Sequence, residues 1–190
     1  MTLYNAIILA LWIIFLVYWA IAAIGVKRSI GATGWWRAGG LRLAIIVLLF
    51  LAFHIPGFRH TLRSARPTAH IGMIEGIVGI ALCALGIGVA IWARRHLGRN
   101  WGMPMSRKAE PDLVTTGPYA FLRHPIYTGI LVAILGSAIG ESPFWLLPLL
   151  LFGAYFVYSA RREEGIMLQQ FPQQYAAYMK RTKMLVPFLL

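Results

Sequence analysis

The sequence predicts an all-α integral membrane protein with about five transmembrane helices. The last two helices are expected to form a short hairpin, and a C-terminal amphipathic interfacial helix is expected to follow. Of the 190 residues, 59% are hydrophobic and only 13% are charged, and the mean hydropathy is +0.68. A soluble domain is much less apolar. The apolar residues also gather into five runs that basic, turn-rich segments separate. We expect these runs to build one structural unit.

Three apolar runs in the first half of the chain predict transmembrane helices. A spanning helix needs roughly 20 apolar residues to cross about 30 Å of hydrocarbon. Leu3–Val26 and Ile71–Ala93 meet this requirement, and Glu75 is the single charged residue of the latter run. Leu41–Phe53 is shorter but almost wholly apolar. Residues 1–93 are therefore predicted to hold three N-terminal transmembrane helices.

The fourth and fifth runs, Ile126–Ile139 and Phe144–Tyr158, are predicted to pair as a helical hairpin. As helices they would extend only about 21 to 24 Å, which is short of the hydrocarbon thickness. The connection between them leaves room for a tight turn alone. Within it, Ser142 is placed to cap a helix whose first residue is Pro143.

The tail after the fifth run spaces its apolar and aromatic residues at helical intervals and adds basic residues beyond them. These residues are Leu168, Phe171, Tyr175, Tyr178, Lys180, Arg181 and Lys183. This pattern predicts an amphipathic helix in the membrane interface. Because proline interrupts a helix, Pro172 predicts a break after Phe171.

The distribution of basic residues predicts the orientation in the membrane. With five spans and the N-terminus outside, 15 of the 18 Lys and Arg residues lie on the inner side and 3 on the outer side. The positive-inside rule then places the connector 94–124 and the C-terminal tail in the cytosol, at the inner membrane if the cell is prokaryotic. The net charge of +12 is thus interpreted as topology signal and lipid headgroup contact, and no nucleic-acid partner is expected.

One segment with candidate chemistry surrounds the start of the fourth run. Pro125 suits the first turn of a helix, whose free N–H groups, together with Arg123 and His124, would suit a carboxylate or phosphate. The alternative is an ordinary interfacial helix start. Tyr127 lies three residues after His124, on nearly the same face. Its ring could hold a cation or an amino group, or could belong to the aromatic belt.

The second segment with candidate chemistry is Arg161-Arg162-Glu163-Glu164, which is predicted to lie at the inner end of the fifth helix. Adjacent helical residues point about 100° apart, so only one of the two carboxylates is expected to enter a shared site. The alternative is a solvated helix end with Arg–Glu pairs. No spacing of His or Cys residues suggests a metal site, and Cys83, the single cysteine, has no disulfide partner.

These segments belong to a longer pattern that resembles a known group. The pattern comprises His96-Leu97-Gly98-Arg99-Asn100-Trp101, then Leu-Val-Thr-Thr-Gly-Pro-Tyr from Leu113, Arg-His-Pro-Ile-Tyr from Arg123, Glu163-Glu164, Phe171, Tyr175 and Tyr178. It resembles the isoprenylcysteine carboxyl methyltransferase and phospholipid N-methyltransferase superfamily of membrane enzymes. The resemblance covers roughly the last 95 residues, and residues 94–190 are therefore expected to form the catalytic half.

The resemblance implies an S-adenosylmethionine pocket at the cytosolic end of the hairpin, closed by the C-terminal segment, with a lipophilic substrate entering from the lipid. The implied cofactor-binding residues are Leu113, Val114, Gly117 and Tyr119 along the adenosine, and Arg123, His124, Pro125, Tyr127, Glu163 and Glu164 around the methionine part. The implied catalytic residues are Tyr127, Arg162, Glu163 and Glu164. In this scheme Arg162 orients a substrate oxygen.

The sequence therefore favours an S-adenosylmethionine-dependent membrane methyltransferase that acts on a lipophilic carboxylate, amine or thiol at the cytosolic face. It does not choose among these acceptors or indicate an oligomeric state. A sterol-reductase-like NADPH-dependent membrane oxidoreductase is the alternative enzyme, because those proteins resemble this chain in the hairpin region. A non-catalytic membrane protein is the other alternative, although a transporter would distribute polar residues along a path across the bilayer.

Overall fold

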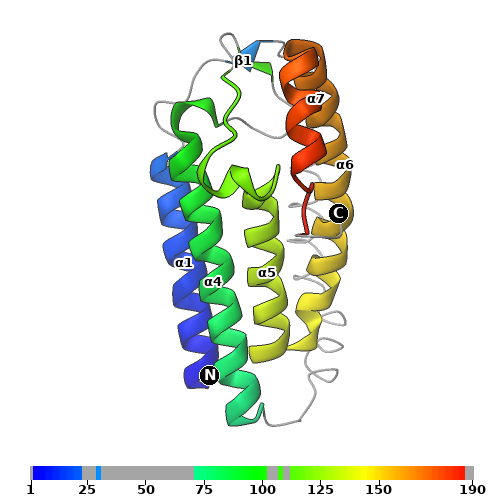
Figure 1. Cartoon of the computed structure of the whole chain (residues 1–190). Helices are drawn as coiled ribbons and strands as arrows, with labels where there is room; N and C mark the ends of the chain where they lie inside the picture. Colours follow the sequence, from blue (N-terminus) through cyan, green and yellow to red (C-terminus); the bar gives the residue numbers. More distant parts are fainter. Residues whose placement is uncertain (1, 23–28, 31–70, 102–106, 109–111, 187–190) are drawn as a thin grey trace.

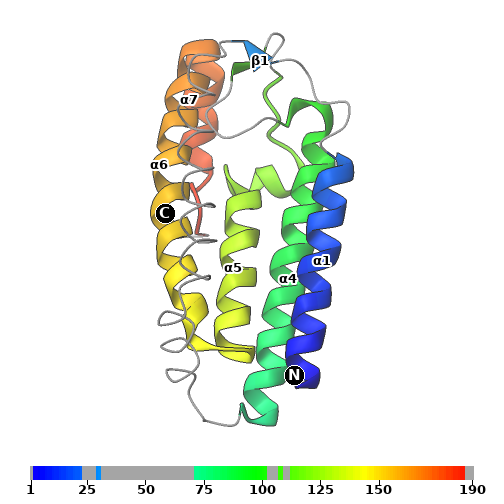
Figure 2. The ribbon, with the colours of Figure 1, turned by 180° about the vertical axis from the view of Figure 1, so that it is seen from behind.

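The computed structural model describes residues 2–22, 29–30, 71–101, 107–108 and 112–186. The elements in chain order are α1 (Leu3–Ala22), β1 (Ser29–Ile30), α4 (Met73–Leu97), η1 (Gly98–Asn100), β2 (Arg107–Lys108), η2 (Gly117–Ala120), α5 (Pro125–Gly140), η3 (Pro143–Trp145), α6 (Leu146–Gln170) and α7 (Pro172–Arg181). The long helices form an elongated bundle, and α7 and the strand pair gather at one end of it (Figures 1 and 2). The strands pair antiparallel, Ser29 opposite Lys108.

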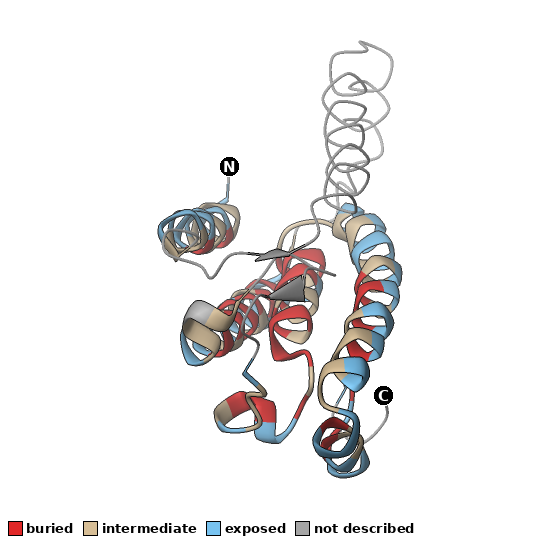
Figure 3. Ribbon diagram, turned by 90° about the horizontal axis from the view of Figure 1, so that it is seen from above, coloured by how far each residue is buried: buried red, intermediate tan, exposed pale blue. Residues whose placement is uncertain are grey.

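The helices have the length and the surface of membrane spans. Among the described residues, Leu3–Ala22, Met73–Leu97 and Pro143–Gln170 are long and apolar enough to cross a bilayer. Large apolar side chains point away from the bundle, among them Leu9 on α1 and Leu150 on α6, which are 50% and 72% exposed. The view along the bundle shows buried residues on the inward sides of the helices (Figure 3). So much exposed apolar surface requires lipid around it, and the chain is an integral membrane protein.

The predicted apolar runs correspond to helices with one correction. The first, third and fourth runs become α1, α4 and α5. The second run, Leu41–Phe53, lies outside the described residues. The prediction that the last helix is short is wrong, because the helical segment that begins at Pro143 continues past Tyr158 to Gln170. The residues after Tyr158 are polar but include Arg, Glu, Met and Gln, which are good helix formers.

The junctions of α6 follow from particular residues. The Ser142 hydroxyl accepts a hydrogen bond from the backbone N–H of Phe144 at 3.4 Å, and Pro143 opens the turn that leads into α6. At the other end α6 stops at Gln170, and α7 begins at Pro172. Proline is favoured at the first helical position because it has no N–H to leave unpaired. The predicted helix break after Phe171 is therefore confirmed.

The aromatic side of α7 packs on the protein. Tyr175 and Tyr178 are 4% and 2% exposed, whereas Lys180 and Arg181 face outward. The Tyr178 hydroxyl donates to the carbonyl of Tyr119 at 2.6 Å, which ties α7 to the connector. Burial raises the pKa of Tyr178 to about 12, so the hydroxyl keeps the proton that it donates. The tyrosine side of α7 therefore faces the protein. Only the outward side, with its basic residues, is free to face the membrane interface, as predicted.

Glycines bring α4 and α5 into backbone contact. A Cβ on Gly86 would lie 2.4 Å from both the backbone nitrogen of Ala133 and the carbonyl oxygen of Gly129, and a Cβ on Gly129 would meet the Gly86 oxygen at 2.6 Å. Gly79 and Gly136 approach in the same way further along. Small residues allow membrane helices to pack this closely. The contact fixes the start of α5 beside the end of α4, where the candidate site lies.

Gly86→Ala is expected to destabilise the protein by about 1–3 kcal/mol, because backbone atoms that cannot rotate away oppose the new methyl group. Gly88→Ala on the same helix is the matched control, since a Cβ there meets nothing within 4 Å. The measurement is reversible unfolding in mixed micelles. Equal stability of the two variants would contradict this account of the helix contact.

Candidate active site

The two polar segments singled out from the sequence meet at the end of the bundle that carries α7 (Figure 1). The Tyr127 hydroxyl donates to Glu163 Oε1 at 2.6 Å. His124 Nδ1 lies 3.5 Å from Glu163 Oε2, and Arg123 Nε donates to Glu164 Oε1 at 2.6 Å. Residues about 40 positions apart in the chain thus share one cluster of charges.

The two glutamates have different surroundings. Glu164 is 7% exposed, pairs with Arg123, and has its Oε1 3.4 Å from His124 Nε2. Glu163 instead lines the cavity described below. Their divergence follows from the 100° between successive helical residues. Of the two carboxylates, Glu163 is therefore the one that faces the cavity, and Glu164 binds the start of α5 to α6.

Three parallel rings fix the position of Tyr127. The His124 and Tyr127 rings stack with centroids 5.4 Å apart and planes 3° apart. Tyr127 in turn stacks on Phe156 of α6 at 4.4 Å and 4°. The spacing of three residues places His124 and Tyr127 one above the other on the helix. The stack leaves the Tyr127 ring little freedom, so its hydroxyl is held against Glu163.

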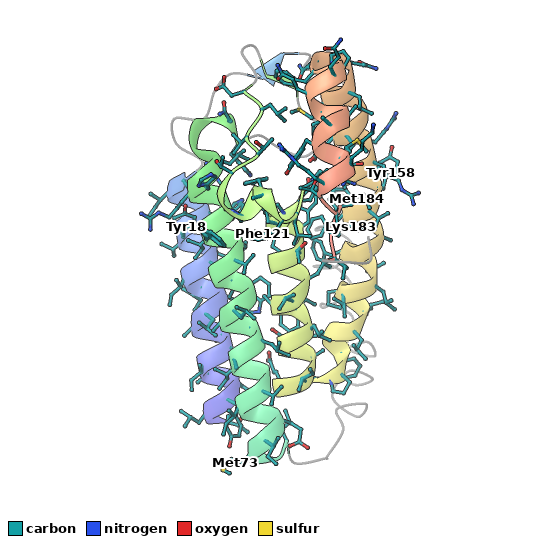
Figure 4. All side chains as sticks on the ribbon, viewed as in Figure 1. Tyr18, Met73, Phe121, Tyr158, Lys183 and Met184 are labelled. Atoms are coloured by element: carbon teal, nitrogen blue, oxygen red, sulfur yellow. The ribbon has the colours of Figure 1, made fainter. Side chains whose placement is uncertain are left out.

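The chain after α7 returns to the start of α5. The backbone N–H groups of Arg123 and His124 donate to the carbonyls of Lys183 and Met184 at 2.8 and 3.1 Å, and Figure 4 labels the two acceptor residues in this return segment. The Arg123 guanidinium also donates to the carbonyl of Thr182 at 2.5 Å. Arg123, which the sequence analysis considered as a ligand for a carboxylate or phosphate, thus binds oxygens of the protein itself.

The connector 112–124 is shaped by a glycine and a proline. Gly117 has φ +59°, and a Cβ on it would lie 2.7–2.9 Å from atoms of the His96 ring. His96 Nε2 forms a hydrogen bond with the Thr116 hydroxyl at 2.8 Å. Pro125 occupies the first turn of α5 and is fully buried. These residues place Tyr119 and His124 in the site.

A cavity of about 310 Å³ lies between these elements, within the size range of small-molecule sites. The predicted residues that line it are Leu113, Val114, Tyr119, Arg123, His124, Tyr127 and Glu163. The predicted residues that do not line it are Gly117, Pro125, Arg162 and Glu164. Arg162 is exposed, and its guanidinium lies over the ring of Tyr158 at 5.8 Å, so the structure does not bring it to the cavity.

Sequence reasoning missed most of the apolar lining. Phe15 and Trp19 come from α1, Trp101 follows α4, and Phe156 and Ile130 come from α6 and α5. These residues lie in or beside strongly apolar runs, where hydropathy cannot distinguish a side chain that faces lipid from one that faces a cavity. The Arg–Asn–Trp sequence after α4 was a partial signal for Trp101.

Comparison with known proteins identifies the family. The phospholipid methyltransferase family matches residues 74–174, which is more than half of the chain. The chain belongs to this family. As a member of the phospholipid methyltransferase family, it has both polar segments, the whole of α5, and all of α4 except Met73 within the matched part. The predicted membership of the isoprenylcysteine and phospholipid methyltransferase superfamily is confirmed, and the oxidoreductase alternative is not favoured.

Three curated proteins are similar to this phospholipid methyltransferase family member. The nickel-cobalt-cadmium resistance protein NccN of Alcaligenes xylosoxydans xylosoxydans is 28% identical over 69% of this chain and 66% of its own length. The cobalt-zinc-cadmium resistance protein CzcN of Cupriavidus metallidurans is 31% identical over 58% of this chain and 50% of its own length. Protein-S-isoprenylcysteine O-methyltransferase of Tribolium castaneum is 28% identical over 59% of this chain and 41% of its own length. The matches thus cover from 41% to 66% of these relatives.

A solved structure has the same fold. The eukaryotic intramembrane Ras methyltransferase, isoprenylcysteine carboxyl methyltransferase, superposes with a TM-score of 0.51 and 23% identity. The match covers 84% of this chain and 55% of the other. The fold of this phospholipid methyltransferase family member is therefore that of a membrane methyltransferase.

The free energy of unfolding is expected to fall as the pH rises above about 6.5, the ordinary pKa of histidine. Burial of His124 opposes its protonation, but the carboxylates of Glu163 and Glu164 outweigh this effect and raise its pKa. The imidazolium therefore stabilises the folded state fully below the unfolded pKa, and this stabilisation is lost as the pH rises through the folded pKa. The measurement is unfolding in detergent between about pH 6 and pH 9.

His124→Gln should remove this dependence on pH. The variant His96→Gln, at an exposed histidine near the same end, should keep it. Both variants keep Glu163 and Glu164, the carboxylates beside His124, and Arg123, which pairs with Glu164. A pH dependence that persists in His124→Gln would show that another group titrates.

Proposed function

We propose that this family member transfers a methyl group from S-adenosylmethionine to a lipophilic acceptor at the cytosolic face of the membrane. The observation that carries the proposal is the Glu163 carboxylate, which the Tyr127 hydroxyl holds at 2.6 Å on the wall of a cavity that aromatic and aliphatic side chains also line. The cofactor carries a cationic sulfonium and a cationic amino group. A carboxylate and aromatic faces are the groups that attract such cations.

The residues present fit this cofactor. Glu163 offers a negative charge to the amino group, and the Tyr127 hydroxyl holds this carboxylate in place. The rings of Tyr119 and Phe156 also line the cavity. Leu113 and Val114 supply an apolar surface for a flat base on the connector side. When bound, S-adenosylmethionine supplies a methyl group that its sulfonium has already activated. The protein then has to align the attacking atom and exclude water, and no strong base is required for a thiolate or carboxylate acceptor.

We assign the predicted site residues to two roles. Those proposed to touch the cofactor or the reacting atoms are Leu113, Val114, Tyr119, His124, Tyr127 and Glu163. Those proposed to position them are Gly117, Arg123, Pro125 and Glu164. Arg162 is left out of both groups because its exposed side chain lies over Tyr158.

We also propose that the cavity end of the bundle faces the cytosol and that α5 and α6 cross the membrane as part of five spans. Exposed basic residues gather at the cavity end, including Arg95, Arg161 and Lys180. The acidic Glu75 and Glu141 lie at the opposite ends of α4 and α5. This division of charge supports the positive-inside orientation. In this arrangement residues 94–190 form the catalytic half.

Titration calorimetry in detergent tests the cofactor. Wild type should bind S-adenosylmethionine, and Glu163→Gln should weaken binding at least about tenfold, because a lost charge-assisted contact is worth roughly 1.4 kcal/mol or more. Tyr127→Phe keeps the ring stack and should cause a smaller loss. Arg162→Gln, one residue before Glu163 but exposed, is the matched control and should bind as wild type does.

Two outcomes would contradict the proposal. One is equal affinity of wild type and Glu163→Gln for S-adenosylmethionine. The other is tighter binding of NADPH than of S-adenosylmethionine, which would favour the oxidoreductase alternative. Tritiated methyl transfer into lipid extracts, with mass-spectrometric identification of the product, then establishes which atom of the acceptor is methylated.

A further inference from the structure

The cavity has an aromatic wall that comes partly from outside the family match. Phe15 and Trp19 on α1 line the cavity together with Trp101 after α4. The Phe15 and Trp19 rings lie 4.8 Å apart, and Trp19 meets the edge of Trp101 at 5.8 Å with the planes at 90°. The family match begins at residue 74, so α1 lies before it. We call Phe15, Trp19 and Trp101 the aromatic wall.

A buried arginine behind the lining holds this wall together. Arg94 in the last turn of α4 is 4% exposed and is not among the residues that line the cavity. Its guanidinium lies 4.6 Å from the centroid of the Trp101 ring, donates to the Gly98 carbonyl at 2.8 Å, and donates to the carbonyl of Ala22 at the end of α1. One side chain thus joins α1, the end of α4 and Trp101.

The cavity lining contains two groups of residues, one charged and one aromatic, which suit different parts of two ligands. The charged side, with Glu163, His124 and Asp112, comes from the segment that matches the family. A reaction shared across a family needs a shared donor site, whereas the acceptor can differ from member to member. The aromatic wall offers apolar area and ring faces, which favour a hydrocarbon body by burial.

We propose that the aromatic wall is the subsite for the apolar body of the methyl acceptor, and that Arg94 is the positioning residue that fixes its shape. The inference rests on the proposed function, because the cofactor defines the charged side of the cavity. The acceptor class is a lipophile whose hydrocarbon part contacts Phe15 and Trp19 while its reacting atom points toward Tyr127 and Glu163.

A photoreactive probe tests the subsite without requiring turnover. A long-chain alkyl alcohol with a terminal diazirine is added to the protein in lipid nanodiscs, and labelled residues are mapped by mass spectrometry. Leu9 and Ile13 on the outward side of α1 are exposed and serve as the internal reference for contact with lipid. Phe15 and Trp19 should be labelled as well, and saturating S-adenosylmethionine should not prevent it.

Labelling confined to the outward side of α1 would overturn the inference. Labelling of Phe15 and Trp19 that disappears with S-adenosylmethionine would also overturn it, because the wall would then belong to the cofactor. Failure of wild type to bind S-adenosylmethionine in calorimetry would instead overturn the proposed function. The two failures are therefore distinguishable.

The role of Arg94 has its own readout. Arg94→Met should reduce labelling of Phe15 and Trp19 about fivefold relative to Leu9, since roughly 1 kcal/mol of cation–π and hydrogen-bond energy is lost, with affinity for S-adenosylmethionine unchanged. Arg94→Lys should restore part of the labelling. Arg95→Met, at the exposed neighbour, is the matched control.

If Arg94→Met does not fold, Trp19→Ala tests the same wall from α1. It should lower labelling at Phe15, whereas Trp92→Ala, at a tryptophan on α4 that is 50% exposed and outside the cavity lining, should not. A Trp19→Ala variant that loses S-adenosylmethionine binding while it keeps labelling at Phe15 would contradict the assignment.

Discussion

The structure of the site depends on the pairing of two adjacent glutamates on α6 with the Arg123–His124 pair at the start of α5. Buried charges are costly unless they are paired, and removing one partner strands the other. The contact between Arg123 and Glu164 therefore fixes α5 relative to α6. The same arginine binds the Thr182 carbonyl, so the return of the chain after α7 depends on this pairing too. One cluster of charges thus positions the cavity lining, the ring stack and the return segment after α7.

Within this cluster the two neighbouring carboxylates have different roles. Glu164 neutralises Arg123, which leaves Glu163 with Tyr127 on the cavity wall. His124 lies within 3.5 Å of both carboxylates and couples them electrostatically. A cationic ligand beside Glu163 would therefore also act on His124, by disfavouring its protonated form. In the proposed function, cofactor binding and the charge of His124 would therefore be linked.

The sequence predicted the parts of the fold that depend on local chemistry. Hydropathy located α1, α4 and α5, and the prolines at positions 125, 143 and 172 marked where helices begin. It could not predict the length of α6, because the helix continues through polar residues after the apolar run ends. It also missed Phe15 and Trp19, since every face of a membrane helix is apolar and only packing shows which face meets a cavity. The exposed position of Arg162 likewise depends on the rotation of α6.

The proposed function accounts for the position of the site at one end of the bundle. A charged cofactor cannot enter the hydrocarbon, and a lipophilic acceptor does not leave it, so the two can meet only near the membrane surface. Further along, backbone contacts at Gly79, Gly86, Gly129 and Gly136 hold α4 and α5 close together. The cavity lies beyond these contacts, where Leu97 near the end of α4 and Ile126 near the start of α5 line it. The close packing at the glycines and the proposed methyl transfer are thus consistent with a site at the same end of the molecule.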